Sequence, residues 1–160
     1  MLVSLYLMEK KILKHPILYI STFLESHRKN YYASLDKARE SEAGVIQWIS
    51  FFLDAVEQTA KDGVKVTQEL LLYDTQIKND VIPQLGRQAK NAMTTLEMLY
   101  IRPLVNAKQL QQSLGFSAQV SQNILRLLTE HGILKEITGN KRNRLFIFHH
   151  YITLLEGKHP

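Results

Sequence analysis

Apolar residues recur at intervals of three and four positions through the N-terminal part of the chain, which places them on one face of an α-helix. The spacing predicts three helices, over residues 2–14, 17–39 and 41–79. Pro16 restricts the residue before it and so ends the first helix near Lys14. The third is expected to be long or kinked, because Gly63 interrupts its apolar stripe of Val45, Trp48, Ile49, Phe52, Val56 and Ala60.

A different order of elements is predicted from Ala89 onward. Asn106 and Ser117 are good helix-capping residues, and each precedes an amphipathic segment. The predicted order is a helix at 92–99, a helix at 106–114, a turn at 115–116, a helix at 117–131, and strands at 133–137 and 145–149 joined by a basic hairpin at 139–144. This is the order of a winged helix-turn-helix domain.

Pro83 and Gly86 mark a joint between these two parts of the chain. The expected domains are a helical region at 1–83 and a winged helix at 89–157, with a linker at 84–88. The predicted fold class is therefore mainly α, with one small two-stranded β-ribbon.

Charge is distributed unevenly between the two parts. Residues 1–88 carry 11 Lys/Arg and 11 Asp/Glu, whereas residues 89–160 carry 9 and 4, so the whole net charge of +5 lies in the C-terminal part. A basic module favours a polyanionic partner such as nucleic acid, although a solvated basic surface has the same composition. The chain has no cysteine, no recognisable signal peptide and no apolar run long enough to cross a bilayer, so we expect a cytoplasmic protein without membrane contact.

The predicted helix at 117–131 has a polar stripe whose side chains suit base edges in a DNA major groove. Cations on the hairpin are placed to contact the phosphate backbone or enter a minor groove. The candidate DNA-binding residues are Gln119, Gln122, Asn123, Arg126, Lys141, Arg142 and Arg144. The alternative is a winged helix that contacts only protein, either its own enzyme or a twin subunit.

Two segments resemble Fic-family proteins just downstream of their catalytic loop, namely Pro16 to Glu40 and Trp48 to Glu57. Residues 1–8 look like the continuation of the family's catalytic helix, and residues 125–144 resemble the winged helix that ends many Fic proteins. The resemblance implies a relationship to enzymes that move AMP from ATP, with Mg²⁺, onto a protein hydroxyl.

The family's catalytic signature, His-x-Phe-x-Asp/Glu-Gly-Asn-Gly-Arg, does not occur in this sequence. The seven glycines are too scattered to form a phosphate-binding loop, and His15 lacks the residues that follow the signature histidine. His149 and His150 are adjacent and point in different directions, so they cannot chelate one metal together. We therefore expect no catalytic residue, no metal site, no cofactor and no AMP transfer from this chain alone.

Part of the family's nucleotide pocket has counterparts here. The resemblance places Tyr31, Tyr32, Leu35 and Arg39 near the adenosine, where Tyr32 and Leu35 offer an apolar surface for the base. Arg39 replaces the smaller polar residue expected beside the ribose. The alternative is that both tyrosines pack against the next helix.

The leading interpretation is a non-catalytic C-terminal region of a Fic-type protein whose winged helix binds double-stranded DNA or a protein. One alternative is a fragment of an active AMP-transferase, in which a missing N-terminal half supplies the chemistry and meets the protein substrate. The other is a free-standing DNA-binding regulator. A homodimer is also expected, through an apolar face formed by Leu2, Leu5, Tyr6 and Met8.

Overall fold

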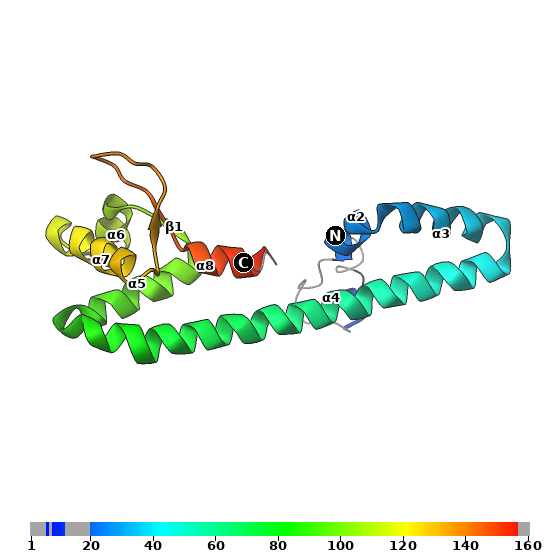
Figure 1. Cartoon of the computed structure of the whole chain (residues 1–160), viewed down its shortest axis with the longest axis horizontal. Coiled ribbons are helices and arrows are strands. Elements are labelled where there is room, and N and C mark those ends of the chain that lie inside the picture. The colour runs from blue at the N-terminus through cyan, green and yellow to red at the C-terminus, as the bar shows by residue number, and fades with distance from the viewer. Residues whose placement is uncertain (1–5, 7, 12–19, 157–160) are drawn as a thin grey trace. The chain divides into compact units, whose positions relative to one another are not determined.

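The computed structural model of the chain describes residue 6, residues 8–11 and residues 20–156 (Figure 1). It is mainly helical with one small antiparallel sheet, which confirms the predicted fold class. Packing divides the chain into two compact units, Met1–Thr67 and Gln68–Pro160. This division precedes the predicted linker at 84–88, so residues 68–88 pack within the C-terminal unit. Across the described residues, no helix combines the length and apolar character needed to traverse a bilayer.

The N-terminal unit contains α2 (Ile20–Ser26), α3 (Arg28–Glu40) and most of α4 (Glu42–Gln76). The single helix predicted at 17–39 is broken at His27, whose ring stacks on Phe23 with 4.1 Å between centroids. The Ser26 hydroxyl also donates to the Phe23 carbonyl oxygen at 2.9 Å. Such side-chain bonds compete with the helical backbone, and sequence periodicity does not reveal them.

The first predicted helix ends earlier than expected. Its described part is helical up to Glu9 and turns at Lys10 and Lys11, where Lys11 has a left-handed φ of 58°. The predicted end near Lys14 is therefore wrong. Leu2 and Leu5 of the expected dimer face lie outside the described residues, whereas Tyr6 is exposed and Met8 half-buried.

α4 begins where the sequence predicts, because the Ser41 hydroxyl accepts a hydrogen bond from the Gly44 amide at 3.1 Å. It continues through Gly63 to Gln76 as one α-helix. A π-helical turn, η1 (Ile77–Val81), and a 3₁₀ segment, η2 (Ile82–Gln88), follow. The chain bends at Gly86, which has φ 52° and ψ −120°.

A close backbone contact fixes α3 against the start of α4. A methyl group added at Gly44 would overlap the Lys37 carbonyl oxygen, whereas one added at Gly63 would meet no atom within 4 Å. Aromatic packing continues the contact, with Phe51 of α4 lying 6.2 Å from Phe23 and 6.5 Å from Tyr31 between ring centroids.

We expect Gly44→Ala to lower the free energy of unfolding of the N-terminal unit by about 1–3 kcal/mol, since α3 and α4 must separate to admit the methyl group. Gly63→Ala is the matched control, and it should raise that free energy by up to about 1 kcal/mol. Urea unfolding followed by fluorescence of Trp48, the only tryptophan, reports on this unit. Equal effects of the two substitutions would contradict the close contact.

The C-terminal unit has the element order of a winged helix. Its elements are α5 (Ala89–Ile101), β1 (Leu104–Val105), α6 (Ala107–Leu114), α7 (Ala118–Glu130), β2 (Lys135–Glu136), β3 (Phe146–Ile147) and α8 (His149–Leu155). The strand order is β1-β3-β2, with Val105 paired to Phe146 and Lys135 to Ile147. The predicted two-stranded ribbon is therefore a three-stranded sheet, and both β1 and α8 were missed.

Local hydrogen bonds explain why α6 and α7 begin where the sequence predicts. The Asn106 side chain accepts from the Gln109 amide at 2.9 Å, while the Gln109 side chain accepts from the Asn106 amide at 2.8 Å. The Ser117 hydroxyl accepts from the Val120 amide at 3.2 Å. Gly115 ends α6 with φ 69°, a left-handed conformation in which glycine is not strained.

The core of this unit includes residues that precede the predicted linker. Ile77, Ile82 and Leu85 are buried together with Leu96 and Leu99 of α5. The remaining fully or nearly fully buried members come from α5 to β3 and the residue after it: Ala92, Val105, Leu110, Ile124, Leu125, Leu128, Ile133, Leu134, Phe146 and Phe148.

An aromatic cluster joins the last turns of α4 to α8. Phe148 lies 5.8 Å from Tyr73, 5.5 Å from Tyr100 and 5.1 Å from Tyr151 between ring centroids. The Tyr100 hydroxyl donates to Asp74 at 2.8 Å. Burial raises the pKa of Tyr73 to about 12, and burial together with the bond to Asp74 raises the pKa of Tyr100. Both phenols are therefore neutral near pH 7.

Candidate nucleic-acid interface

A groove of about 620 Å³ lies between α6, α7 and the loop that joins β2 to β3. This loop, at residues 137–145, extends beyond the helices and is drawn in orange in Figure 1. The groove is lined by Asn106, Ala107, Lys108, Gln111, Gln122, Leu125, Lys141, Arg142, Asn143, Arg144 and Phe146.

All charged side chains that line the groove are cations. Lys108 comes from the first turn of α6, and Lys141, Arg142 and Arg144 come from the loop. All four are exposed, and among the described residues none forms an ion pair with a carboxylate. Like charges gathered without counterions produce a positive potential that attracts anions.

The base of the loop has a defined conformation. The Ile137 amide donates to the Leu145 carbonyl oxygen at 3.0 Å, and the Leu145 amide donates to the Thr138 hydroxyl at 3.2 Å. Gly139 and Asn143 take left-handed φ values of 63° and 53°, which turn the chain at the two sides of the tip. The Arg144 guanidinium lies over the ring of Phe146, 5.5 Å from its centroid.

The structure brings several predicted DNA-binding residues together. Gln122 of α7 lines the same groove as Lys141, Arg142 and Arg144. Gln119 is exposed one turn earlier on α7 and does not line the groove. The buried residues of α7 are Ser121, Ile124, Leu125 and Leu128, and of these Leu125 also lines the groove beside Gln122.

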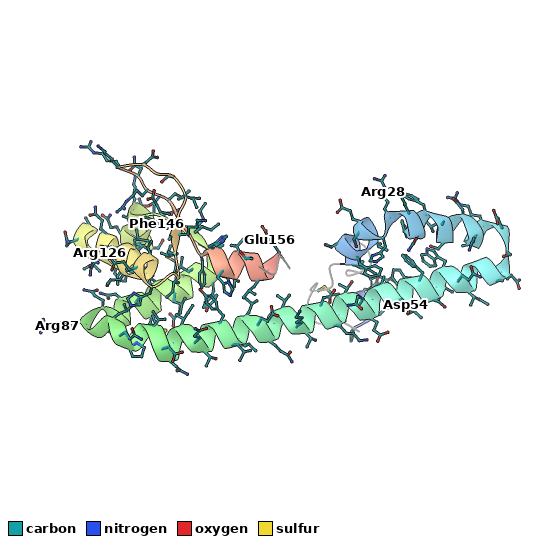
Figure 2. All side chains as sticks on the ribbon, in the orientation of Figure 1. Arg28, Asp54, Arg87, Arg126, Phe146 and Glu156 are labelled. Carbon is teal, nitrogen blue, oxygen red and sulfur yellow. The ribbon has the colours of Figure 1, made fainter. Side chains whose placement is uncertain are left out.

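Asn123 and Arg126 are held by contacts within α7 instead. The Arg126 guanidinium donates to both carboxylate oxygens of Glu130, at 2.6 and 2.7 Å, and to the Asn123 side-chain oxygen at 2.9 Å. Figure 2 marks Arg126 on α7 and Phe146 in the sheet. Asn123 and Arg126 are therefore both present on the helix surface, but their side chains already have partners.

The contribution of α6 was missed by sequence analysis. Asn106, Lys108 and Gln111 line the groove, although the sequence indicated only that Asn106 caps a helix. A lysine in the first turn after a capping box is only a weak indication of a binding surface. Only the packing of α6 against α7 shows that Lys108 faces the same groove as the loop.

Of the predicted nucleotide-binding residues, Tyr31 and Tyr32 line one depression on the surface of α2 and α3. This depression of about 240 Å³ is also lined by Leu24, Glu25 and Arg28, but not by Leu35 or Arg39. Arg39 pairs with Asp36 at 3.5 Å.

The two tyrosines differ in their surroundings. The Tyr31 ring lies toward Phe51 of α4, while the exposed Tyr32 ring has the Arg28 guanidinium 5.5 Å from its centroid. Tyr31 is thus placed for helix packing, and Arg28 lies against the aromatic surface expected to hold a base.

The two histidines of α8 differ in what surrounds their side chains. His150 meets the ring of Tyr73 edge-on, with 4.5 Å between centroids, and His149 is exposed in the first turn. Within the described residues, no group of three or more His, Asp or Glu side chains is arranged to hold a metal ion. His15 lies outside those residues.

A scan of the sequence against models of known protein families finds no match. The resemblance to Fic proteins therefore rests on the segments quoted above, and what it implies about activity is a proposal.

Proposed function

We propose that this chain is the non-catalytic C-terminal region of a Fic-type protein and that its winged-helix unit binds double-stranded DNA. The observation that carries the DNA-binding proposal is the groove between α6, α7 and the loop at 137–145. It combines four cations with amide side chains and has no carboxylate in its lining. Duplex DNA is a regular polyanion, and this combination of groups suits both its phosphates and its base edges.

The cations are distributed over two elements that can contact separate phosphates. Lys108 lies in the first turn of α6, where the helix dipole adds partial positive charge, and the loop carries the other three. Lysine and arginine bind phosphate through charge-assisted hydrogen bonds, and each contact releases condensed counterions from the duplex. Affinity should therefore decrease steeply as salt concentration increases.

α7 supplies groups that can distinguish bases. A helix of 13 residues is about 20 Å long and can enter a major groove about 12 Å wide. Gln122 and Gln119 each carry a donor and an acceptor on the exposed side of this helix, which is the pairing that suits adenine. In this proposal α7 contacts base edges while Lys108 and the loop contact the backbone.

Titration of a fluorescently labelled duplex of about 20 base pairs at about 50 mM salt tests this proposal directly. Anisotropy should rise with protein concentration and fall when salt is raised to about 200 mM. The proposal is wrong if the folded protein leaves anisotropy unchanged at the lower salt concentration. The winged helix would then be assigned to protein contact.

The Arg126–Glu130 ion pair leads to a further prediction. Glu130→Gln removes a negative charge next to the exposed face of α7 and frees the Arg126 guanidinium for phosphate. Duplex affinity should increase, by roughly tenfold at low salt if one phosphate contact is gained. Glu97→Gln on α5 changes net charge equally outside the groove and is the control. A gain shared by both variants would show a general charge effect.

The proposal assigns no AMP transfer to this chain, because the family's base, metal ligand and phosphate loop have no counterpart in its sequence. Incubation with labelled ATP, Mg²⁺ and cell lysate should leave no AMP on any protein. The control is the same mixture containing heat-denatured protein. Labelling that increases with time above this control would contradict the assignment.

A further inference from the structure

α4 carries an apolar surface that the helices of its own unit do not cover. Ile46, Ile49, Leu53 and Val64 are 66%, 44%, 58% and 58% exposed. Their spacing of three, four and eleven residues places them on one side of the helix, together with the small residue Ala60. Isolated apolar residues are ordinary on a surface, but a continuous helical stripe of them indicates an interface.

This stripe is distinct from the face of α4 that packs against α2 and α3. The inner face carries Phe51 and the fully buried Ala55, and Phe51 contacts rings of both preceding helices. Ile49 and Leu53 lie on a different side. A helix with apolar residues over both faces requires a second partner in addition to those in its own chain.

The charges beside the stripe are ordered along the helix. Asp54 and Glu57 come first, and Lys61 and Lys65 follow at spacings of three and four residues, so acids lie on one half of a flank and bases on the other. Within one helix Glu57 and Lys61 also pair with each other on the exposed surface. When the order is reversed, as on an antiparallel copy of the helix, each acid stands opposite a base. Two such helices attract when they run antiparallel, because a two-fold axis across the pair brings the same flank of both copies together in reversed order. In a parallel pair this flank faces the partner's opposite flank, and the four charges do not meet their own copies.

We propose that the chain forms a homodimer in which α4 pairs antiparallel with α4 of a second copy, about a two-fold axis close to Thr59. In this arrangement Leu53 lies opposite Val64, Asp54 approaches Lys65, and Glu57 approaches Lys61. Ala60 and Gly63 lie near the axis, where small side chains allow two helices to come close. A two-fold interface uses the same patch on both copies, and the reversed charge order of this flank meets that requirement.

This dimer uses other residues than the homodimer expected from Leu2, Leu5, Tyr6 and Met8, and it does not depend on the DNA-binding proposal. The chain contains no cysteine, so introduced cysteines can report which residues meet. The experiment uses the full chain carrying Leu53→Cys or Val64→Cys, alone and mixed, with a cross-linker that has two thiol-alkylating groups about 8–10 Å apart, the separation of packed helices.

The mixture of Leu53→Cys and Val64→Cys should yield a cross-linked dimer, because residues 53 and 64 meet across the axis. Either variant alone should not, since its two cysteines would be about 15–18 Å apart along the antiparallel helices. Cross-linking of each variant on its own, with no increase on mixing, would indicate a parallel pair. That result, or no cross-linking in any sample, would overturn the proposal.

Charge reversal gives an independent measurement without touching the apolar stripe. Asp54→Lys with Glu57→Lys makes the whole flank positive and should weaken dimerisation by about tenfold or more in sedimentation experiments. Adding Lys61→Glu and Lys65→Glu restores the original net charge and the reversed order, so dimerisation should recover. Failure of the fourfold variant to recover, while its helical content is unchanged, would exclude the antiparallel arrangement.

Discussion

Neutralising Lys141, Arg142 and Arg144 together should lower the slope of log affinity against log salt by about 2.7 on duplex DNA, since about three phosphate contacts are lost. At 0.1 M salt this corresponds to a loss of affinity on the order of 500-fold. The loss should be similar for every duplex sequence, because contacts to phosphate carry no base information. Glutamine substitutions keep the side chains polar, and anisotropy titrations at four or five salt concentrations give the slope.

The matched control neutralises Arg87, Lys90 and Arg102, which are exposed in the same unit but do not line the groove. Figure 2 marks Arg87 just before α5. This control removes the same net charge, so its slope should change much less. Equal effects of the two triple variants would show that net charge, and not the groove, determines affinity. An unchanged slope in the groove variant would place the DNA contacts elsewhere.

Phe148→Ala should lower the free energy of unfolding of the C-terminal unit by about 3–5 kcal/mol. Phe148 is fully buried and contacts three tyrosine rings, so its truncation leaves a cavity between α5, α8 and the last turns of α4. A typical domain is stable by only about 5–15 kcal/mol, so this single change removes a large fraction. Near-UV circular dichroism during urea unfolding follows the tyrosines of both units, and Trp48 fluorescence measured in parallel identifies the contribution of the N-terminal unit.

Two further substitutions serve as references for the loss of stability caused by Phe148→Ala. Phe148→Leu keeps most of the apolar volume and should cost much less than the alanine variant. Leu155→Ala on the exposed side of α8 should change stability by less than about 0.5 kcal/mol. A small effect of Phe148→Ala would mean that the cluster can close around the missing ring.

Elements that begin with local hydrogen bonds were predictable from the sequence. Asn106 and Ser117 bond to amides three residues later, so the starts of α6 and α7 depend on neighbouring residues alone. The break at His27 also has local causes, but its stacking on Phe23 leaves the apolar spacing unchanged. β1 could not be predicted, because Leu104 and Val105 are extended only through pairing with β3.

The candidate site was predicted in part for the same physical reason. The basic loop and the polar stripe of α7 are visible in the order of residues, whereas Lys108 joins them only through the packing of α6 on α7. The partners of Arg126 show a limit of patterns based on residue type. An arginine at the right helical spacing is consistent with DNA contact, yet the Glu130 carboxylate one turn later already binds it.

The contacts between Tyr73, Phe148 and Tyr151 have a consequence for synthesis of the chain. Tyr73 and its ring partners lie far apart in sequence, so the ribosome completes α4 long before the residues that cover its last turns emerge. α6 and α7 can form early, but the Tyr73 ring stays without its partners Phe148 and His150 until β3 and α8 have left the exit tunnel. Termination of translation before Phe148 would therefore expose apolar surface to chaperones, even though every helix before α8 is present.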